Sequence, residues 1–290
     1  MPRSFIDKIA QGTRRVVPDV NKLVTGTPPA NSRMHLFQFG TSPAAGTYPG
    51  AALAMQQIVG GTTPSLNGGI TIVADPTAPN KQYLTRSSLK NLVASGKGRL
   101  YILDLLVTYN TITTNVTTAA QTMTASAGGA DVRPRTANRR TQLMLDVTTA
   151  LGGVAANITA GYTKTVTNTA GRSSGAQALV VSSIQGRLPL SPLFMPLQAG
   201  DEGVASLQTL TVSALMGAGV IAACLVDLLA IIDISADTEP RERAYVTDQA
   251  ALIEIPTGAA LSYIWEPISA VASQQLAVTH DFAECDLTAA

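Results

Sequence analysis

Residues 188–235 constrain the fold most, because an alternating segment and a long apolar run follow one another there. Residues 206–213 alternate polar and apolar side chains and are rich in Thr, Leu and Val. This pattern is typical of a strand with one buried face and one solvated face. After a turn at residues 216–219, residues 220–234 are almost continuously apolar, as in a strand buried on both faces. The two segments predict a hairpin whose second strand lies near the middle of a sheet.

The same apolar run does not predict a transmembrane helix. Its uncharged stretch from Val212 to Val226 ends at Asp227, whereas a spanning helix needs about 20 apolar residues. Asp233 interrupts the apolar character a second time. We therefore expect no contact with a membrane.

The composition indicates a folded chain whose surface is covered by neighbours. Hydrophobic residues make up 46% of the 290 residues and the formal net charge is +1, which excludes a disordered chain. Charged residues make up only 13%, which leaves few charges for the surface of a monomer. We therefore expect a homo-oligomer, with a trimer as the preferred form. The only cysteines, Cys224 and Cys285, argue against a disulfide scaffold.

Charge is distributed unevenly along the chain. Residues 227–290 contain 11 acidic and 2 basic residues, a net charge of −9, so that the +1 of the whole chain leaves +10 for residues 1–226. Such asymmetry favours complementary surfaces that meet head to tail, or a basic face that lies on an acidic partner. Two solvated faces of opposite charge are an equally good interpretation.

The first 98 residues predict an extended arm that carries short helices. The first helix begins after Ser4, and residues 49–59 and 85–94 predict two more, each followed by Gly. Helices this short are marginally stable in water, so the arm is expected to lie on a partner. The apolar side chains expected at that interface are those of Phe5, Ile6 and Ile9.

From residue 99 onward the pattern changes to strands separated by turn residues. Besides residues 206–213 and 220–234, the strands predicted there are residues 100–109, 141–147, 154–162, 178–184, 251–255 and 260–265. Before residue 99, residues 34–39 predict one further strand. Turn signals about every ten residues, without long intervening helices, favour a mainly β fold. We expect an antiparallel β-sandwich of the jelly-roll type over residues 99–290, with the arm over residues 1–98.

One segment has the spacing of a catalytic nucleophile elbow. Residues 171–175 match the pattern around Ser173, and Asp201 and His280 follow in the order of a hydrolase triad. An elbow needs a buried strand before the serine and a helix after it, whereas the flanking residues are polar and then β-like. We interpret the segment as a flexible turn, and no catalytic residue is expected.

Cofactor and metal motifs are not found in the sequence. His35 and His280 are the only histidines, and neither lies at ligand spacing from a cysteine, so no zinc site is expected. Residues 95–98 lack the glycine and Ser/Thr positions of a phosphate-binding loop. Acidic residues around Arg241 and Arg243 could bind a cation, but a solvated turn of mixed charge is the preferred interpretation. The sequence predicts neither a cofactor nor a metal.

The densest basic cluster lies in residues 132–140. Its arginines could attract phosphate groups, but the cluster contains no aromatic residue for base stacking. Docking onto acidic residues of a neighbouring subunit is the preferred interpretation, and nucleic acid is disfavoured as a partner. The expected interface residues are Arg133, Arg135, Arg139 and Arg140.

Several short motifs follow one another along residues 99–265. They are Leu103-Asp104-Leu105-Leu106 with Tyr109, residues 132–135, Gly161-Tyr162-Thr163, Gly171-Arg172, residues 195–204 and Leu261-Ser262-Tyr263-Ile264-Trp265. In this order they resemble a family of structural proteins of tailed-bacteriophage virions, which are capsid-associated and decoration- or cement-like. The chain departs from the family at Asp227, where the family tends to place Pro-Leu after the long apolar strand.

The resemblance implies a non-enzymatic component of the virion, assembled in the host cytoplasm. The expected protein is a capsid cement or decoration subunit, and its expected partners are the major capsid protein or other virion proteins. A neck or tail component of the same particle is one alternative. A receptor- or glycan-binding β-sandwich is the other, although it should expose more aromatic residues than 1 Trp and 7 Tyr can provide.

Overall fold

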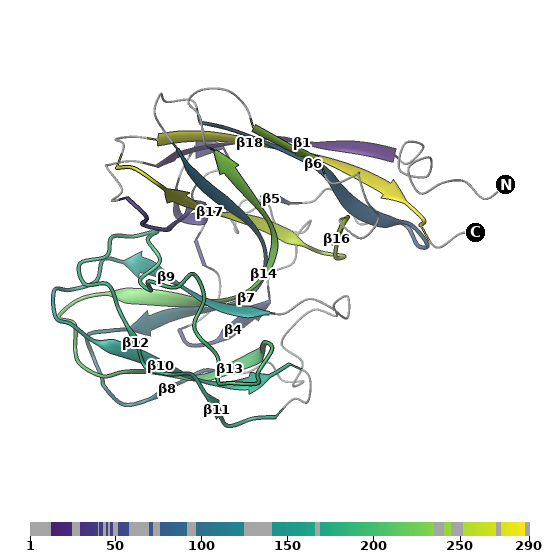
Figure 1. Cartoon of the computed structure of the whole chain (residues 1–290). Helices are drawn as coiled ribbons and strands as arrows, with labels where there is room; N and C mark the ends of the chain where they lie inside the picture. The colour runs from purple at the N-terminus through teal and green to yellow at the C-terminus, as the bar shows by residue number, and fades with distance from the viewer. Residues whose placement is uncertain are drawn as a thin grey trace.

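The computed structural model describes residues 13–24, 30–39, 41–42, 45, 47–48, 52–57, 70–71, 76–91, 97–124, 141–165, 169–234, 241–244, 252–270 and 274–287. Over these residues the protein is mainly β, with three sheets and a short 3-10 helix, η1 (Leu36–Gln38). A central sheet lies between a terminal sheet, which contains the first and last strands, and a lower sheet (Figure 1). The strands pair antiparallel throughout these sheets.

The central sheet has seven strands and is built on the two longest strands of the described residues. These are β7 (Gly98–Thr113) and β14 (Val220–Ile234), which pair with each other along nearly their whole length. The strand order is β2-β17-β7-β14-β9, and β4 and β5 add to β7 and β17. The shorter strands are β2 (Met34–His35), β4 (Met55–Gln57), β5 (Ile70–Thr71), β9 (Gln142–Thr149) and β17 (Ala260–Pro267).

The terminal sheet joins strands from the two ends of the chain. Its order is β15-β6-β18-β1-β3, and β16 adds to β6. Its strands are β1 (Thr13–Val24), β3 (Thr41–Ser42), β6 (Lys81–Asn91), β15 (Arg241–Ala244), β16 (Ile253–Ile255) and β18 (Gln274–Cys285).

The lower sheet has five strands and comes from the middle of the chain. Its order is β11-β10-β13-β8, and β12 adds to β10. The strands are β8 (Gln121–Thr122), β10 (Asn157–Lys164), β11 (Arg172–Ser173), β12 (Gln177–Ala178) and β13 (Val204–Val212).

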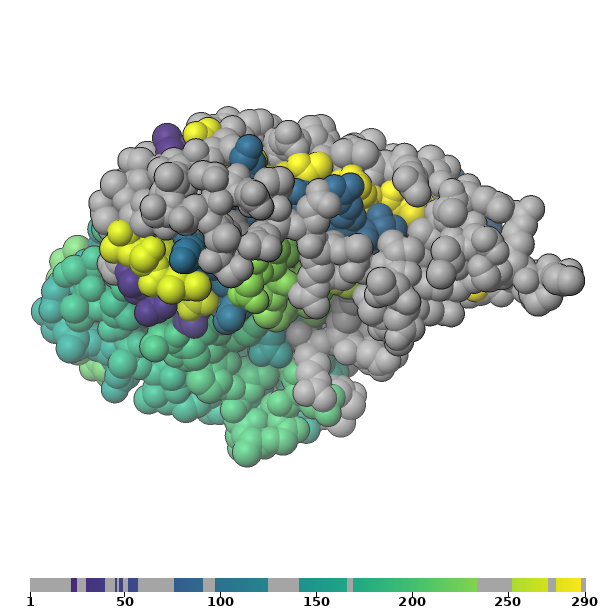
Figure 2. All heavy atoms as spheres, turned by 45° about the horizontal axis from the view of Figure 1, so that its top comes forward, coloured from purple at the N-terminus to yellow at the C-terminus, as the bar shows by residue number. Residues whose placement is uncertain are grey.

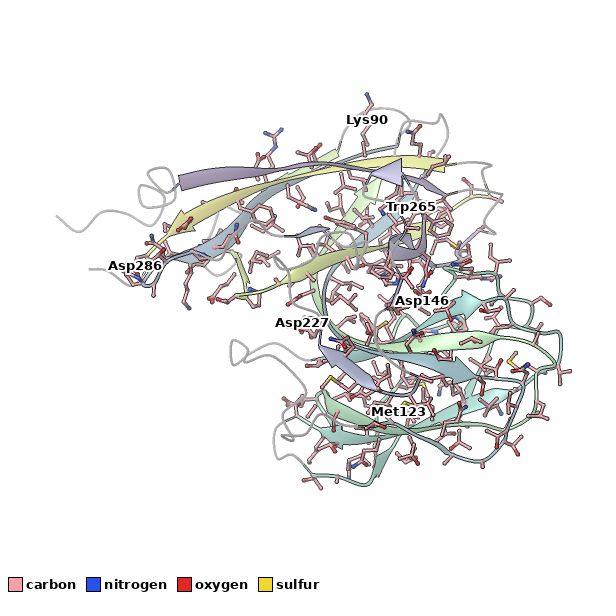
Figure 3. The ribbon with its side chains drawn as sticks, turned by 180° about the vertical axis from the view of Figure 1, so that it is seen from behind. Lys90, Met123, Asp146, Asp227, Trp265 and Asp286 are labelled. Carbon is pink, nitrogen blue, oxygen red and sulfur yellow. The ribbon has the colours of Figure 1, made fainter. Side chains whose placement is uncertain are left out.

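One face of the central sheet contributes to two separate hydrophobic cores. Near the start of β7, Leu100 and Ile102 pack with Trp265 in the core beneath the terminal sheet. Near its end, Val107 and Tyr109 belong to the core that faces the lower sheet. Figure 3 shows Trp265 in the first core and Met123 in the second. The chain is therefore two stacked sandwiches that share β7 and β14.

The two cores meet at a pair of buried aspartates. Asp104 and Asp227 face each other in the β7–β14 register, and they are 0% and 2% exposed. The register shifts on either side of this pair, between Leu225 and Val226 and between Leu228 and Ala230. Such bulges bend and twist a strand, so a single strand pair can follow both sandwiches. Asp104 accepts a hydrogen bond from the Ala260 backbone N–H at 3.0 Å.

The opposite face of the central sheet is covered by loops instead of a sheet. Phe37 and Tyr48 stack on each other, with ring centroids 4.6 Å apart, in a third core that includes Leu103 and Cys224. Residues 186–195 run along the edge of β9, where the Met195 backbone N–H donates to the Leu143 carbonyl at 2.8 Å. Covering an edge strand in this way removes a row of unpaired backbone groups.

The mainly β prediction is confirmed, and most of the predicted strands are present. Predicted residues 100–109, 141–147, 206–213, 220–234 and 260–265 correspond to β7, β9, β13, β14 and β17, and β14 has the predicted bounds. β14 pairs on both sides and is buried on both faces, as its apolar sequence predicts. Residues 178–184 are an exception, because only Gln177–Ala178 form a strand there.

The predicted hairpin of residues 206–213 and 220–234 is wrong. β13 pairs with β10 and β8 in the lower sheet, whereas β14 pairs with β7 and β9 in the central sheet. Residues 213–219 therefore carry the chain from one sheet across to the other. The apolar faces of both strands point into the shared core, where Leu210 and Leu225 are each 0% exposed.

The predicted short helices are wrong where the structure describes those residues. Residues 85–91 belong to β6, which pairs with β18, and residues 55–57 form β4. The predicted helix after Ser4 lies outside the described residues. Strands before and after position 98 pair within the terminal and central sheets. This pairing does not test whether residues 99–290 fold without residues 1–98. The division into an arm of residues 1–98 and a domain of residues 99–290 stays a prediction.

In the part of the chain that the structure describes, no helix has the length and apolar character needed to cross a membrane.

Because β14 is shared by both sandwiches, a cavity made in β14 by substitution should lower the stability of the protein strongly. Ile221 is 0% exposed within the lower core. Ile221→Ala should lower the free energy of unfolding by about 2–5 kcal/mol, because the removed methyl groups leave a cavity in packed surroundings. Urea denaturation followed by circular dichroism measures this change. The matched control is Ile268→Ala, at a side chain that is 58% exposed, and equal losses in both variants would contradict the assigned core.

Candidate functional site

The seven side chains predicted from the sequence to form an interface lie outside the described residues. This group comprises Phe5, Ile6, Ile9, Arg133, Arg135, Arg139 and Arg140. Their role at an interface stays a prediction.

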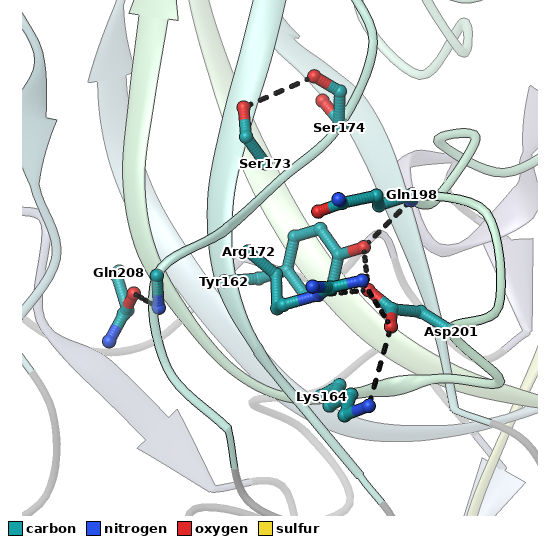
Figure 4. Close-up of polar contacts among 9 residues, drawn as sticks. Tyr162, Lys164, Arg172, Ser173, Ser174, Gln198, Asp201 and Gln208 are labelled. Carbon is teal, nitrogen blue, oxygen red and sulfur yellow. Dashed lines mark hydrogen bonds and ion pairs between the residues drawn. The ribbon is translucent and has the colours of Figure 1, made fainter.

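The structure instead brings together residues from three of the short motifs noted in the sequence. Tyr162 lies in β10, Arg172 in the adjacent β11, and Asp201 in the turn that precedes β13. Figure 4 shows their side chains meeting at the edge of the lower sheet. The register pairs Tyr162 with Arg172 across the two strands, so the arginine lies beside the ring. We call these three residues the Asp201 cluster.

The carboxylate of Asp201 is the centre of this cluster. Arg172 donates to both carboxylate oxygens, from Nε to Oδ2 at 2.8 Å and from Nη2 to Oδ1 at 2.9 Å. The Tyr162 hydroxyl donates to Oδ2 at 2.7 Å, and Lys164 Nζ lies 3.8 Å from Oδ1. The Tyr162 oxygen in turn accepts from the Gln198 backbone N–H at 2.8 Å. Both ends of the turn at residues 198–201 are therefore tied to β10 and β11.

The electrostatics of the cluster favour a permanent ion pair. The hydrogen bonds from Arg172, with a smaller contribution from Tyr162, hold the pKa of the Asp201 carboxyl below its ordinary value. The carboxylate side chain is 0% exposed, and that of Arg172 is 25% exposed. Because the carboxylate already accepts from two side chains, the cluster is suited to fixing a turn. A bidentate arginine gives both strength and a defined geometry to such a link.

Two of the motif glycines lie close to neighbouring chain segments. A Cβ atom on Gly161 would lie 2.4 Å from Thr209 Oγ1 on the neighbouring strand β13. A Cβ atom on Gly203 would lie 2.9 Å from the Thr141 carbonyl oxygen. At Gly203 the neighbour is backbone, so glycine is required where the chain before β13 approaches Thr141, whereas at Gly161 the Thr209 hydroxyl would have to move.

A second polar cluster joins the central sheet to its covering loop. His35 Nδ1 lies 2.8 Å from Asp146 Oδ2, and His35 Nε2 lies 2.7 Å from Ser262 Oγ. The Tyr48 hydroxyl donates to the same carboxylate oxygen at 2.5 Å, and Gln38 Nε2 donates to it at 3.2 Å. We call these five residues the His35 network. It connects β2, β9 and β17 with the segment that covers them.

The connectivity of serine, histidine and aspartate in the His35 network is that of a hydrolase triad. However, His35 and Asp146 are 0% exposed and Ser262 is 1% exposed. The serine lies inside β17, between its neighbours in the central sheet, so the arrangement leaves no space for a substrate at the hydroxyl. Buried polar groups are stabilised by satisfying one another, and the network fixes the covering loop on the sheet.

Sequence reasoning missed the His35 network, although a signal for it was present. His35, Asp146 and Ser262 each occupy a buried position inside a predicted strand with apolar neighbours. A polar residue at such a position needs a partner.

The thiol of Cys224, in β14, is affected by the same carboxylate. Burial and the charge of Asp146 raise the pKa of this thiol well above its ordinary value.

The hydrolase candidates weighed from the sequence are not brought together. Ser173 lies in the lower sheet, Asp201 is bound by Arg172, and His280 lies in β18 of the terminal sheet. β11 has two residues and is not followed by a helix, so residues 171–175 are not a nucleophile elbow. Over the described ranges, no group of three or more His, Cys, Asp or Glu is placed to hold a metal ion.

His280 forms the third buried polar site, in the core beneath the terminal sheet. Its Nδ1 lies 2.9 Å from Ser87 Oγ, and its Nε2 lies 2.8 Å from the Tyr263 hydroxyl. The ring is 0% exposed and stacks on Tyr263 with centroids 5.6 Å apart. Burial lowers the pKa of His280 to about 3, so the neutral ring is the form that the folded protein accommodates.

Fold and sites together define a mainly β protein in which the polar clusters cross-link sheets and loops. Comparison of the chain with protein-family models, with curated proteins and with solved structures found no match.

The Asp201 cluster predicts that a hydroxyl group stabilises the turn. Tyr162→Phe should lower the free energy of unfolding by about 1 kcal/mol, because the Gln198 N–H loses its acceptor and Asp201 loses one donor. Urea denaturation measures the loss. Ser173→Ala, next to Arg172 in β11, is the control and should leave stability unchanged, since the Ser173 hydroxyl only contacts the Ser174 carbonyl at 3.2 Å. An effect of Ser173→Ala as large as that of Tyr162→Phe would contradict the role of the tyrosine.

The neutral state of His280 predicts acid sensitivity with a defined sign. The unfolded chain binds a proton at His280 below about pH 6.5, whereas the folded chain does so only near pH 3. The contribution of His280 to the free energy of unfolding is therefore fully present above pH 6.5. Between pH 6.5 and pH 3 this contribution should fall by about 1.4 kcal/mol for each pH unit.

Urea denaturation at several pH values tests this for the wild type and for His280→Gln, whose side chain does not titrate. Carboxylates also titrate near pH 4, but they contribute to both proteins, so the difference between the two curves isolates His280. Parallel curves between pH 6.5 and 4.5 would contradict the assignment.

Proposed function

We propose that this chain is a non-enzymatic structural protein of a tailed-phage particle, a capsid cement or decoration subunit. In this role it stabilises the shell through contacts with the major capsid protein and with other copies of itself. The jelly-roll order of strands and the clamp role of the N-terminal residues belong to the same proposal. The proposed location is the virion.

The observation that carries this proposal is that the short motifs on which the resemblance rests supply residues that stabilise the fold. Tyr162, Arg172 and Asp201 come from three separate motifs and are bound to one another. Leu103, Leu105 and Ile264, from two further motifs, pack in the core that the covering loop closes. Residues in such positions stabilise the fold and do not contact a substrate. This supports a structural protein over an enzyme, whose motifs would contain catalytic residues.

The scarcity of charge also supports a subunit that is surrounded by other chains. Only 13% of residues are charged, and large apolar side chains such as Val116 and Ile184 are 69% and 50% exposed. Contact with neighbouring subunits would remove such side chains from water. A neck or tail component would fit this observation equally, so it stays the alternative within the same particle.

The receptor- or glycan-binding alternative receives less support. Trp265, the single tryptophan, is 0% exposed, and each tyrosine whose side chain the structure describes is buried. Exposed aromatic rings are the residues that provide contact area at low entropic cost in binding surfaces. The described surface offers none from tyrosine or tryptophan.

The proposal predicts binding to particles at a fixed ratio. Purified chain added to particles of the producing phage that lack it should co-sediment with them and saturate at a constant ratio to the major capsid protein. Particles already carrying the chain serve as the control and should bind no more. Saturated particles should also withstand heating better than bare ones. Absence of the chain from purified virions by mass spectrometry would overturn the proposal.

The same assay tests the N-terminal residues. A variant without residues 1–12 keeps every strand from β1 onward, so it should fold and yet bind particles more weakly, because Phe5, Ile6 and Ile9 are removed. Undiminished occupancy would contradict the clamp role and leave the rest of the proposal standing.

A further inference from the structure

Four loops meet at one end of the sandwich formed by the central and lower sheets. They are residues 114–120, 150–156, 179–186 and 213–219, and they follow β7, β9, β12 and β13. This end is on the left in Figure 1, opposite the side where β18 ends. In Figure 2 the same end shows the teal and green of the later three loops. We call this surface the loop tip.

The loop tip carries most of the large aliphatic side chains that are exposed in the described part of the chain. Val116 is 69% exposed, Ile184 is 50% exposed and Val154 is 49% exposed. Leu215 and Val181 add side chains that are 45% and 39% exposed. Scattered single apolar residues on a surface are ordinary, whereas several on one surface mark an interaction site.

Backbone hydrogen bonds hold the four loops together as one surface. The Ser182 N–H donates to the Gly152 carbonyl at 3.0 Å, and the Gly152 N–H donates to the Ala218 carbonyl at 3.0 Å. The Met216 N–H donates to the Thr114 carbonyl at 2.9 Å. Ser182 is held at a φ of 52°, a conformation that a non-glycine residue keeps only when its surroundings fix it. A surface fixed before binding loses little entropy on contact.

The chemistry of the loop tip restricts its partner. None of the four loops contains Asp, Glu, Lys, Arg or His, so a charged partner surface would lose its hydration there without gaining an ion pair. Surfaces that bind membranes combine apolar residues with aromatic and basic ones, and these loops contain no Trp, Tyr or Phe either. The partner must therefore present an uncharged aliphatic surface.

A second copy of this chain presents such a surface. Around a symmetry axis each residue lies close to the same residue of the next copy, so a charged side chain near the axis would meet a like charge. A surface without charge avoids that repulsion. Resting on the proposed role as an assembling particle subunit, we propose that copies of this chain associate through the loop tip around a symmetry axis.

Sedimentation velocity of the full chain tests the proposal with a matched set of variants. The wild type should sediment as an oligomer at micromolar concentration. Ile184→Lys and Val154→Lys, which place like charges at the axis, should each reduce the mass to that of a single chain. Ile268→Lys is the control, because Ile268 is 58% exposed but follows β17 at the far end of β7. It should leave the oligomer intact, and circular dichroism should show that all variants are folded.

The outcomes separate this inference from the proposed function. A monomeric wild type, or loop-tip variants that keep the oligomeric mass, would overturn the inference, even if the chain binds particles. Equal dissociation by Ile268→Lys would overturn it as well, because the effect would then not be specific to the loop tip. An oligomer that the loop-tip variants dissociate, but that ignores particles, would support the inference and count against the proposed function.

Discussion

The pairing of β7 with β14 is the interaction on which the rest of the structure depends. Both strands are longer than either sandwich needs, and each contributes side chains to two cores in succession, from Leu225 below to Leu229 and Ile232 above. Bulges on either side of Asp104 and Asp227 let the pair bend between the two partner sheets. A change in this pair would therefore be felt in both sandwiches, whereas a change in β10 or β18 would affect one.

Polar side chains fix the positions that hydrophobic contact leaves open. Burial of aliphatic groups is not directional, so it does not determine where the turn at Asp201 or the segment around His35 must lie. Arg172 determines the first position through two hydrogen bonds, and Asp146 determines the second through three donors. Each buried polar group must find its own partner or lose stability. Such clusters thus select one arrangement of loops from the many that would bury similar apolar area.

Local pattern predicted β7, β9, β13, β14 and β17 because each alternates or is continuously apolar over its own length. It failed where the partner is distant. Residues 85–94 predicted a helix because Leu89, Leu92 and Val93 share one helical face and Gly96 follows, yet residues 85–91 belong to β6, which pairs with β18. β18 itself was missed because His280 interrupts its alternation, and only the partners Ser87 and Tyr263 make a buried histidine acceptable. The turn between β13 and β14 gives no local sign of which sheet each strand joins. The Asp201 cluster was visible only as separate motifs.

The strand order of the terminal sheet has a consequence for how the chain matures. β1 pairs with β18, so the first strand of the described chain lies beside the last one. During synthesis, β7 to β14 leave the ribosome before β18, so they can complete the lower sandwich while β18 has not yet been made. Until β18 has been made, β1 and β6 each lack a neighbour, and open strand edges of this kind pair readily with other chains. Polysomes that carry several nascent copies would bring such edges close together, so the pairing of β18 with β1 and β6 is the step that closes these edges to other chains.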